Sequence, residues 1–423
     1  MNYLQALEYI HKNCWQGSKP GLSRTRELLK ALGDPQSKLR FIHVAGTNGK
    51  GSFCSMLSSV LTKAGYKVGT YTSPYILRFN ERMKINGNDI PDDTLAALTE
   101  KIRPLAEKME DHPTEFELIT ALAMDYFSQE ECDVVVLECG MGGRLDSTNV
   151  IPSPLLGVIT GIAIDHAAFL GDTEEKIAAE KAGIIKEGCD LLWCGDSPEA
   201  EGVIREKAKA ENARMHIPNR SELTPISFEL SHTTLRSEEL GEITLPLLGS
   251  YQVNNLENVL AAIKLLKVKG FDISNSAVKD GIASTVWHAR YEKVQDSPIV
   301  ICDGGHNPQG IDAAVESTKL YFKNEKLLVL TGVMADKDYR YMAKKISGIA
   351  SKVFCITPDN PRSLKAEEYA KVFRENDICA EGFDTVDEAV KKAVSEAKKE
   401  NRALLCLGSL YMYSEVIDSL KKH

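Results

Sequence analysis

The sequence predicts an α/β protein of two domains, each built on a mostly parallel sheet with covering helices. The chain has 423 residues, more than one compact domain usually holds. Its short apolar runs lack polar–apolar alternation, as in strands buried on both faces, and segments of helical spacing separate them. This series occurs once before and once after residues 285–297. We therefore expect an N-terminal domain over residues 1–289 and a smaller, Rossmann-like domain over residues 297–423.

The first series begins with FIHVA (41–45), an apolar run that predicts a buried strand. A Gly-rich turn follows, and residues 50–64 predict a helix because their apolar side chains recur on one face. Further strands are expected at 67–72, 133–138 and 155–160, with a helix at 116–128. The polar segment 195–245 is expected to add short β-structure to the first domain.

The second series starts at PIVICDGGHNP (298–308), which predicts a strand and then a loop. Three more apolar runs predict buried strands, and two amphipathic segments between them predict helices. The strands are expected at 326–333, 352–357 and 403–409, and the helices at 364–374 and 386–400.

Composition excludes several functional classes. The net charge of −9 disfavours a general nucleic-acid binder, which needs a basic face. No apolar run reaches the roughly 18 residues that cross a bilayer, and the N-terminus does not resemble a signal peptide. The ten cysteines include no C-x-x-C pair, so neither a zinc site nor a redox dithiol is indicated. We expect a cytoplasmic protein, and nothing in the sequence demands more than a monomer.

The strongest local motif is HVAGTNGKGS (43–52), which lies between the first predicted strand and its helix. Its glycines allow a tight turn with inward-pointing amides, the helix N-terminus adds positive potential, and Lys50 can neutralise β- and γ-phosphates. The motif departs from G-x-x-x-x-G-K-[ST], because Val44 replaces the first glycine and Gly51 precedes Ser52. A connecting turn is the alternative; ATP or GTP binding is favoured. The predicted nucleotide contacts here are Gly46, Thr47, Asn48, Gly49, Lys50, Gly51 and Ser52.

GTNGKGS resembles the phosphate loop of the Mur ligase superfamily, and five further segments narrow the resemblance. They are TSPYILRFNERMKING (72–87), LECGMGGRLDSTN (137–149), IDHAAFLGDT (164–173), AAEKAGIIK (178–186) and DGGHNP (303–308). In this order they resemble the folylpolyglutamate synthase and dihydrofolate synthase family over essentially the whole chain. The resemblance implies an ATP-dependent ligase: ATP phosphorylates a folate-type carboxylate, and the amine of L-glutamate attacks the acyl phosphate.

The same resemblance implies a magnesium site. Ser73, Glu138 and His166 match the family's Mg²⁺ ligands, one or two ions being expected, and Lys181 matches a lysine that CO₂ converts into a carbamate. Mg²⁺ prefers hard oxygen ligands together with phosphates and water. Taken singly, Glu138 could be a solvated strand-end acid, His166 an ordinary loop histidine and Lys181 a solvated helix charge.

In the second half, Asn254, Arg290 and Asp303 match residues that contact the nucleotide. Arg290 lies at the domain boundary and is expected to reach ATP only when the domains close; its setting, WHAR, departs from the family's Trp-Pro-Gly-Arg. His306 and Asn307 match a signature expected to face glutamate or the acyl phosphate, with ordinary loop residues as the alternative. Lys50, Lys181, Asp303 and His306 are the expected catalytic residues.

For the pterin end, the resemblance points to Phe116, Glu117, Arg144, Leu145 and Asp146. An aromatic ring can stack on a planar heterocycle while polar groups bind its edge, although Phe116 could equally pack in the helix core. GGRLD resembles the form found in enzymes that also act on dihydropteroate, which favours a bifunctional enzyme.

Two other functions remain open. A Mur-type ligase could join a different acid and amino acid; the muramoyl-peptide ligases carry a further N-terminal domain, for which the 45 residues before Gly46 are too few. A nucleotide-dependent switch ATPase is the other class, but it would not need the DGGHNP loop or Arg290. ATP turnover that depends on both glutamate and a folate would separate them.

Overall fold

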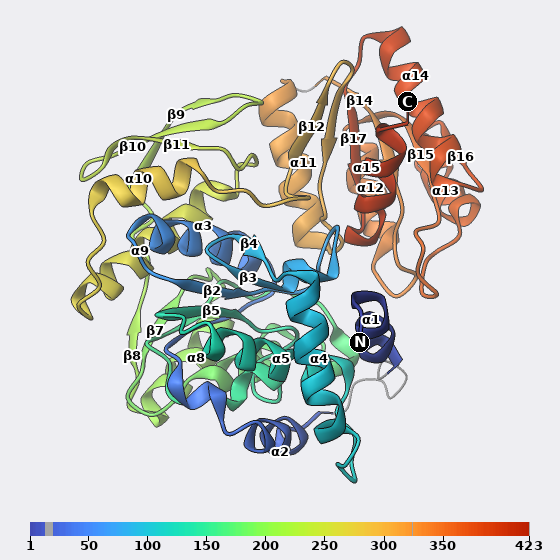
Figure 1. Ribbon diagram of the computed structural model, residues 1–423. Helices are drawn as coiled ribbons and strands as arrows, with labels where there is room; N and C mark the ends of the chain where they lie inside the picture. The colour runs from blue at the N-terminus through green and yellow to red at the C-terminus, as the bar shows by residue number, and fades with distance from the viewer. Residues whose placement is uncertain (13–19, 324, 423) are drawn as a thin grey trace. The chain divides into compact units, whose positions relative to one another are not determined.

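The computed structural model describes residues 1–12, 20–323 and 325–422 (Figure 1). The chain forms two compact units. The first comprises Met1–Glu222 and Asn254–Thr285, and the second comprises Leu223–Val253 and Val286–His423. The chain thus crosses from one unit to the other three times.

The first unit contains a sheet with strand order β4-β3-β2-β5-β1-β6-β7-β8. The strands β2, β5, β1, β6, β7 and β8 pair in parallel in this order, and β3 and β4 add an antiparallel edge. β1 lies in the interior of the sheet, and every one of its residues is buried. The strands are β1 (Phe41–Ala45), β2 (Val68–Tyr71), β3 (Met83–Ile85), β4 (Asn88–Asp89), β5 (Val134–Glu138), β6 (Leu156–Ile159), β7 (Asp190–Trp193) and β8 (Arg214–His216).

Helices cover both faces of this sheet, with α3 and α10 on one face and α5 on the other (Figure 1). The α3–α10 contact is close, since a Cβ on Gly281 would lie 2.5 Å from the Val60 Cα. On the other face, α5 packs into a core shared with α1, α2 and α4. The helices are α1 (Tyr3–Lys12), α2 (Ser23–Ala31), α3 (Lys50–Lys63), α4 (Asp92–Ala106), α5 (Glu115–Gln129), α6 (Ala167–Leu170), α7 (Glu174–Lys181), α8 (Pro198–Ala210), α9 (Gln252–Val268) and α10 (Asn275–Ala283).

The second unit contains a sheet with strand order β12-β13-β17-β14-β15-β16, parallel except for β12. A separate antiparallel sheet, β11-β10-β9, clusters with this unit. The strands are β9 (Leu223–Phe228), β10 (Thr233–Ser237), β11 (Gly241–Leu245), β12 (Glu292–Asp296), β13 (Ile299–Cys302), β14 (Leu327–Thr331), β15 (Ala350–Cys355), β16 (Ala380–Gly382) and β17 (Leu404–Leu407). The helices are α11 (Pro308–Phe322), α12 (Tyr339–Ser347), α13 (Ala366–Arg374), α14 (Val386–Glu400) and α15 (Tyr413–Leu420).

The predicted fold class is confirmed: two mostly parallel sheets occur, and each predicted strand and helix matches an observed one to within a few residues. The segment 195–245 differs from its prediction. Residues 198–210 form α8, and the short strands of residues 223–245 cluster with the second unit. The division into domains 1–289 and 297–423 stays a prediction. The two compact units have other bounds, because residues 223–253 belong to the second unit.

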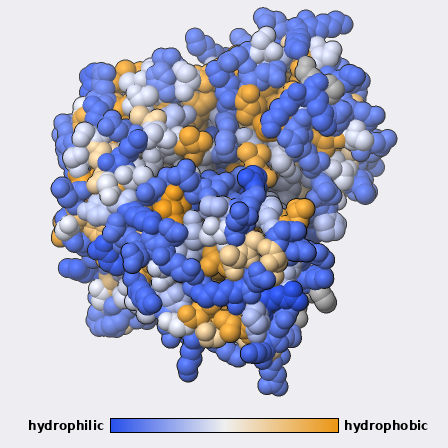
Figure 2. All heavy atoms as spheres, viewed as in Figure 1, coloured by the Kyte–Doolittle hydropathy of each residue, from blue (hydrophilic) through white to orange (hydrophobic). Residues whose placement is uncertain are grey.

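Hydrophilic residues cover most of the face visible in Figure 2, and hydrophobic residues occur there in small separate groups. Among the residues that the structure describes, no helix is long and apolar enough to cross a membrane. The expected cytoplasmic location stays a prediction.

Candidate active site

The predicted phosphate loop lies between the end of β1 and the start of α3. Gly46 has φ 146° and Gly49 has φ 85°, backbone conformations that residues with a Cβ rarely adopt. Space is restricted as well, because a Cβ on Gly46 would lie 2.0 Å from Thr160 Oγ1. Thr160 Oγ1 donates to the Asn48 carbonyl at 2.7 Å. The loop is therefore packed against the residue that follows β6.

Thr47 fixes the loop from the other side. Its backbone N–H donates to the Gly161 carbonyl at 2.9 Å. Its hydroxyl oxygen accepts from the Ala163 N–H at 3.0 Å and lies 3.1 Å from the Ala163 carbonyl. These contacts fix the shape of the loop, so the amides at the start of α3 are preorganised for an anion.

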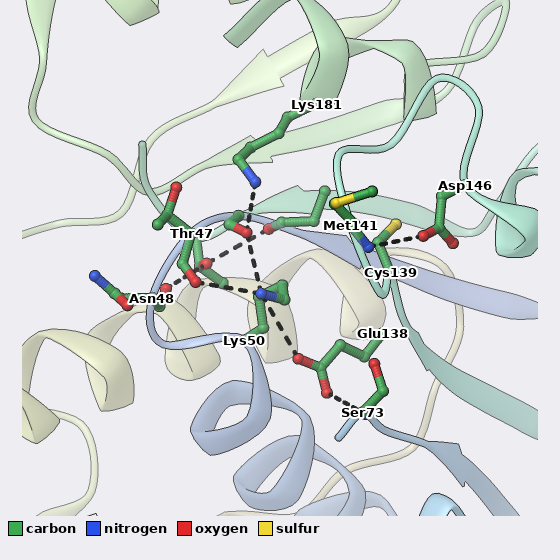
Figure 3. A network of polar contacts seen from close by, with 12 residues as sticks. Thr47, Asn48, Lys50, Ser73, Glu138, Cys139, Met141, Asp146 and Lys181 are labelled. Carbon is green, nitrogen blue, oxygen red and sulfur yellow. Dashed lines mark hydrogen bonds and ion pairs between the residues drawn. The ribbon is translucent and has the colours of Figure 1, made fainter. Parts of the chain in front are cut away.

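Two lysines meet at one carbonyl of this loop (Figure 3). Lys50 Nζ donates to the carbonyls of Gly46 at 3.1 Å and Thr47 at 3.2 Å, and Lys181 Nζ donates to the Gly46 carbonyl at 2.8 Å. Lys181 reaches this point from the last residue of α7. Two cations beside a helix N-terminus make a strong local attraction for a polyphosphate, within a chain of net negative charge.

Lys181 differs from an ordinary helix lysine. It is buried, with 4% of its surface exposed. Burial, and next the charge of Lys50, lower the pKa of its amine to about 7. A substantial fraction of the amine is then neutral near pH 7, and the neutral amine is the form that can react with CO₂. The sequence alternative, a solvated helix charge, does not fit this burial.

Glu138 ends β5 and lies beside the phosphate loop. Its carboxylate is buried; Oε1 lies 3.8 Å from Lys50 Nζ, and Oε2 accepts from the Ser73 N–H at 3.2 Å. The parallel strands β2, β5 and β1 bring these residues to one edge of the sheet. A buried carboxylate beside a serine and a phosphate loop fits Mg²⁺, which takes one or two carboxylates together with phosphate and water.

His166 is the third residue predicted to bind Mg²⁺ directly. His166 is exposed, with φ 52°, and lies directly before α6. Among the described residues, no group of three or more His, Cys, Asp and Glu side chains is arranged to hold a metal ion. His166 as a metal ligand therefore stays a prediction.

The loop from Cys139 to Asn149, here the 139–149 loop, contains three predicted pterin residues. Asp146 is buried and accepts from the Met141 N–H at 2.9 Å and from the Thr148 N–H at 3.0 Å. Burial raises the pKa of this carboxyl, and the hydrogen bonds oppose that shift. Arg144 is exposed and donates to Glu180 at 2.7 Å, and Leu145 is partly buried. Asp146 thus shapes the loop from within.

The other two predicted pterin residues begin α5. Phe116 is partly buried, and its ring lies so close to Gly140 that a Cβ there would be 2.5 Å away. It therefore touches the 139–149 loop, and it also packs against the hydrophobic core, so its contact with the pterin stays a prediction. Glu117 is buried and accepts from Arg24 Nε and Nη2, each at 2.9 Å, and from the Thr114 N–H at 2.8 Å. These contacts favour a structural role for Glu117, which ties α2 to α5.

For the nucleotide, the structure favours a neighbour of the predicted residue. Asn254 is exposed, and its carbonyl accepts from Arg220 at 3.1 Å. Asn255 instead abuts the phosphate loop, since a Cβ on Gly49 would lie 2.8 Å from Asn255 Oδ1. The predicted residue was Asn254 alone, and the next residue of the helix is the one that lies against Gly49. Asn254 as a nucleotide contact stays a prediction.

The second unit has its own group of predicted residues, around the end of β13. Asp303 is buried: Oδ1 accepts from the Gly305 N–H at 2.7 Å, and Oδ2 accepts from the Tyr291 N–H at 2.8 Å and from Tyr251 Oη at 3.1 Å. Burial raises the pKa of this carboxyl, and the charge of Arg290 opposes the shift. Arg290 Nη1 donates to its neighbour's carbonyl, that of Ala289, at 2.8 Å. Tyr251 is a partner that motif reasoning missed.

The DGGHNP signature continues from Asp303 into α11. Asn307 is buried and forms the N-cap of α11, where its Oδ1 accepts from the Gly310 N–H at 2.8 Å. This is a structural role, so the alternative of an ordinary loop residue describes Asn307 well. His306 is partly buried, with Nδ1 2.8 Å from the Gly304 carbonyl. A proton on Nδ1 satisfies this contact and leaves Nε2 as an acceptor.

Comparisons with known proteins agree with this geometry. Residues 44–266 match the Mur ligase middle domain, and residues 289–410 match the glutamate ligase domain of Mur ligases. The fold and the phosphate loop thus place the chain in the Mur ligase class. A dihydrofolate synthase/folylpolyglutamate synthase from Bacillus subtilis (strain 168) is 38% identical to the chain, over 99% of each protein.

Solved structures narrow the class further. The structure of E. coli FolC in complex with DHPP and ADP has a TM-score of 0.87 and 30% identity, covering 100% of this chain and 98% of that one. An FPGS–AMPPCP–folate complex has a TM-score of 0.85 and 33% identity, covering 99% and 100%. The chain belongs to the folylpolyglutamate synthase and dihydrofolate synthase family.

Proposed function

We propose that this protein uses ATP to join L-glutamate to the carboxylate of a folate, and that it also accepts dihydropteroate. Family membership gives the class, an ATP-dependent ligase that forms C–N bonds. The observation that carries the proposal is the pair of lysines at the Gly46 carbonyl, with the Glu138 carboxylate beside them. Phosphate-binding amides, the Lys50 ammonium and one acid at a single strand edge suit phosphoryl transfer, and the Lys181 amine lies beside them.

The proposed reaction has two steps. A carboxylate oxygen of the folate attacks the γ-phosphorus of ATP, so that an acyl phosphate forms and ADP leaves. The glutamate amine then attacks the acyl carbon, and the tetrahedral intermediate expels phosphate and gives up a proton. Lys50 would neutralise the charge that moves onto the phosphates. Asp303 holds the loop that leads to His306, and His306, through Nε2, is proposed to act near the amine.

Glu138 and Ser73 are the residues proposed to hold Mg²⁺. A bound Mg²⁺ would stabilise the negative charge that develops on the phosphates. Lys181 is proposed to react as a neutral amine with CO₂: a nitrogen–carbon bond forms, one proton leaves, and the neutral amine becomes an anionic carbamate. Its burial and its lowered pKa, about 7, favour this reaction.

The carbamate can be tested by its dependence on CO₂. Removing dissolved CO₂ should lower the turnover of the wild-type enzyme, and added bicarbonate should restore it. The deficit should grow below about pH 7, because the neutral fraction of the Lys181 amine falls there. Lys181→Arg should turn over slowly and without response to bicarbonate. Wild-type turnover that ignored CO₂ at every pH would exclude the carbamate.

Dihydropteroate as a second acceptor is supported by the GGRLD sequence in the 139–149 loop and by the double name of the Bacillus subtilis relative. The test is phosphate release with ATP and Mg²⁺, with glutamate and either dihydropteroate or tetrahydrofolate, each component also being omitted singly. Release that needs glutamate and accepts both pterins would support the whole proposal. Release with tetrahydrofolate alone would restrict it to polyglutamylation.

Two outcomes would favour the alternatives. Release that needs an amino acid but neither pterin would indicate another Mur-type ligase. Release that ignores all added substrates would indicate a nucleotide-dependent switch. Glutamate as the amine donor, and the expected monomeric state, are open to the same assay and to light scattering.

A further inference from the structure

A buried histidine lies in β1, three residues before Gly46, and the proposed reaction gives it no role. His43 is fully buried, in the interior strand of the first sheet. Burial, and next the charge of Lys186, lower the pKa of its imidazole to about 3, so the ring is neutral in the folded protein. A neutral imidazole has one N–H and one bare nitrogen, and the contacts around the ring show which is which.

Thr148 links this ring to Asp146. Thr148 Oγ1 lies 2.5 Å from Asp146 Oδ1 and 2.9 Å from His43 Nε2, and it is completely buried. A hydroxyl has one proton, and the shorter contact, to a carboxylate, is the one that takes it. The hydroxyl oxygen must then accept from His43 Nε2–H. Cys139 Sγ, 3.1 Å from the same nitrogen, is a second and weaker acceptor.

The second ring nitrogen agrees with this order. His43 Nδ1 is buried and has no hydrogen-bond partner. A proton on Nδ1 instead would leave that N–H without an acceptor and Nε2 without a donor, because the Thr148 proton is directed to Asp146. The three groups therefore form a directed chain, from His43 Nε2–H to the Thr148 hydroxyl to the Asp146 carboxylate.

This chain of hydrogen bonds ends at Asp146, the residue that shapes the 139–149 loop. Asp146 accepts the Met141 and Thr148 N–H groups as well as the Thr148 hydroxyl. In its protonated form the carboxyl would have to become a donor, and the Thr148 hydroxyl would have to turn toward His43. The direction of the chain thus favours the charged carboxylate, whose acceptors hold both ends of the loop turn.

We infer that His43 is a positioning residue for the pterin substrate: it orients the Thr148 hydroxyl, which holds Asp146 and with it the 139–149 loop. This inference rests on the proposed function, because the loop is proposed to bind the pterin end. His43 was predicted only as part of a strand and of the phosphate-loop motif. The inference gives this residue of the sheet core an effect on the affinity for the substrate.

Matched variants test the chain. Thr148→Val keeps the side-chain shape and removes the hydroxyl, whereas Thr148→Ser keeps the hydroxyl. We expect Thr148→Val to raise the KM for dihydropteroate and tetrahydrofolate about tenfold, the effect of one lost hydrogen bond, with the KM for ATP unchanged. Thr148→Ser should behave as wild type. Equal KM changes for ATP and pterin, or a Thr148→Ser variant as poor as Thr148→Val, would overturn the inference.

The histidine is tested in the same way. His43→Leu should reproduce the KM change of Thr148→Val, and His43→Gln, whose amide can supply an N–H near the Nε2 position, should restore much of the loss. The variant with both His43→Leu and Thr148→Val should be no worse than Thr148→Val alone, because the two residues act in one chain. Additive losses would contradict a shared role. Thermal unfolding of each variant separates these effects from loss of the fold.

A readout without substrate separates this inference from the proposed function. Nitrogen NMR of histidine-labelled protein should show His43 neutral and protonated at Nε2, with His43→Gln assigning the signal. Thr148→Val should shift that signal. Protonation at Nδ1 would overturn the chain, whatever the enzyme's substrate. Absence of pterin-dependent turnover in the wild type, with the Nε2 signal present, would instead refute the proposed function and the positioning role while leaving the chain itself in place.

Discussion

Two buried carboxylates end strands in the two units, and their partners differ. Glu138, the last residue of β5, accepts from the Ser73 N–H at 3.2 Å, and its Oε1 lies 3.8 Å from Lys50 Nζ. Asp303, after β13, accepts three hydrogen bonds of 2.7 to 3.1 Å from its own loop and from Tyr251. Glu138 has a cation, Lys50, close to its carboxylate, whereas Asp303 accepts from its own loop and from Tyr251. The same position at the end of a parallel strand thus lies beside the phosphate loop in one unit and holds a loop in the other.

The largest expected effect comes from Glu138→Gln. We expect kcat to fall by a factor of roughly 100 to 1,000, a usual loss when one charge-stabilising group of an active site is removed. The melting temperature should stay nearly unchanged, because an amide oxygen can still accept from Ser73. Steady-state kinetics at saturating Mg²⁺ and thermal unfolding measure the two quantities. A variant that melted much earlier with unchanged kcat would reverse the comparison.

Asp303→Asn should act mainly on stability. An amide has one acceptor oxygen, so the donors on one side of the present carboxylate lose their partner, at a cost of roughly 1–3 kcal/mol. We expect the second unit to unfold at lower temperature, and calorimetry measures this. Tyr251→Phe, which removes one of the three donors, serves as the milder control. A normal melting temperature for Asp303→Asn would show that its loop does not depend on the carboxylate.

His43 supplies a prediction for acid. Its pKa is about 3 in the folded protein and 6.5 for an unperturbed histidine, as in the unfolded chain. Between these values the unfolded chain binds more protons, so stability falls as the pH is lowered. From about pH 7 to about pH 5 this group alone should remove roughly 2 kcal/mol of stability. His43→Gln should lack that component, and denaturant unfolding at the two pH values compares the slopes. Parallel slopes would mean that His43 titrates normally.

The smallest effect is expected at Arg144. Its ion pair with Glu180 is exposed and contributes less than about 1 kcal/mol, so Arg144→Ala should unfold almost as the wild type does. Any change should appear instead in the KM for the pterin substrate, since Arg144 lies on the 139–149 loop. Glu180→Gln is the matched control, which breaks the pair but keeps the arginine. Unchanged KM in Arg144→Ala would remove this residue from the predicted substrate contacts.

Particular residues show which features of the protein could be predicted from the sequence. The apolar runs located the strands, and the glycines of residues 46–51 located the phosphate loop, because both depend on local chemistry. Lys181 was identified by its match to a motif, and its local helical pattern alone favoured a solvated charge. Asn254 was predicted and Asn255 was not, since the sequence does not show which of two adjacent helical side chains faces Gly49. The predicted ligand roles all stay predictions, those of Ser73, Glu138, His166, Leu145, Arg290 and Asp303 among them.

The sequence by itself determined the fold class, the strands and helices with clear apolar patterns, the phosphate loop and the family. Periodicity, turn residues and motif order are properties of neighbouring residues, so they can be read along the chain. The tertiary structure alone decided which groups meet: Lys181 with Gly46, His43 with Thr148, and Tyr251 with Asp303. These contacts join residues far apart in the chain, and the pairing of parallel strands, which sets them, is decided only when the whole sheet assembles.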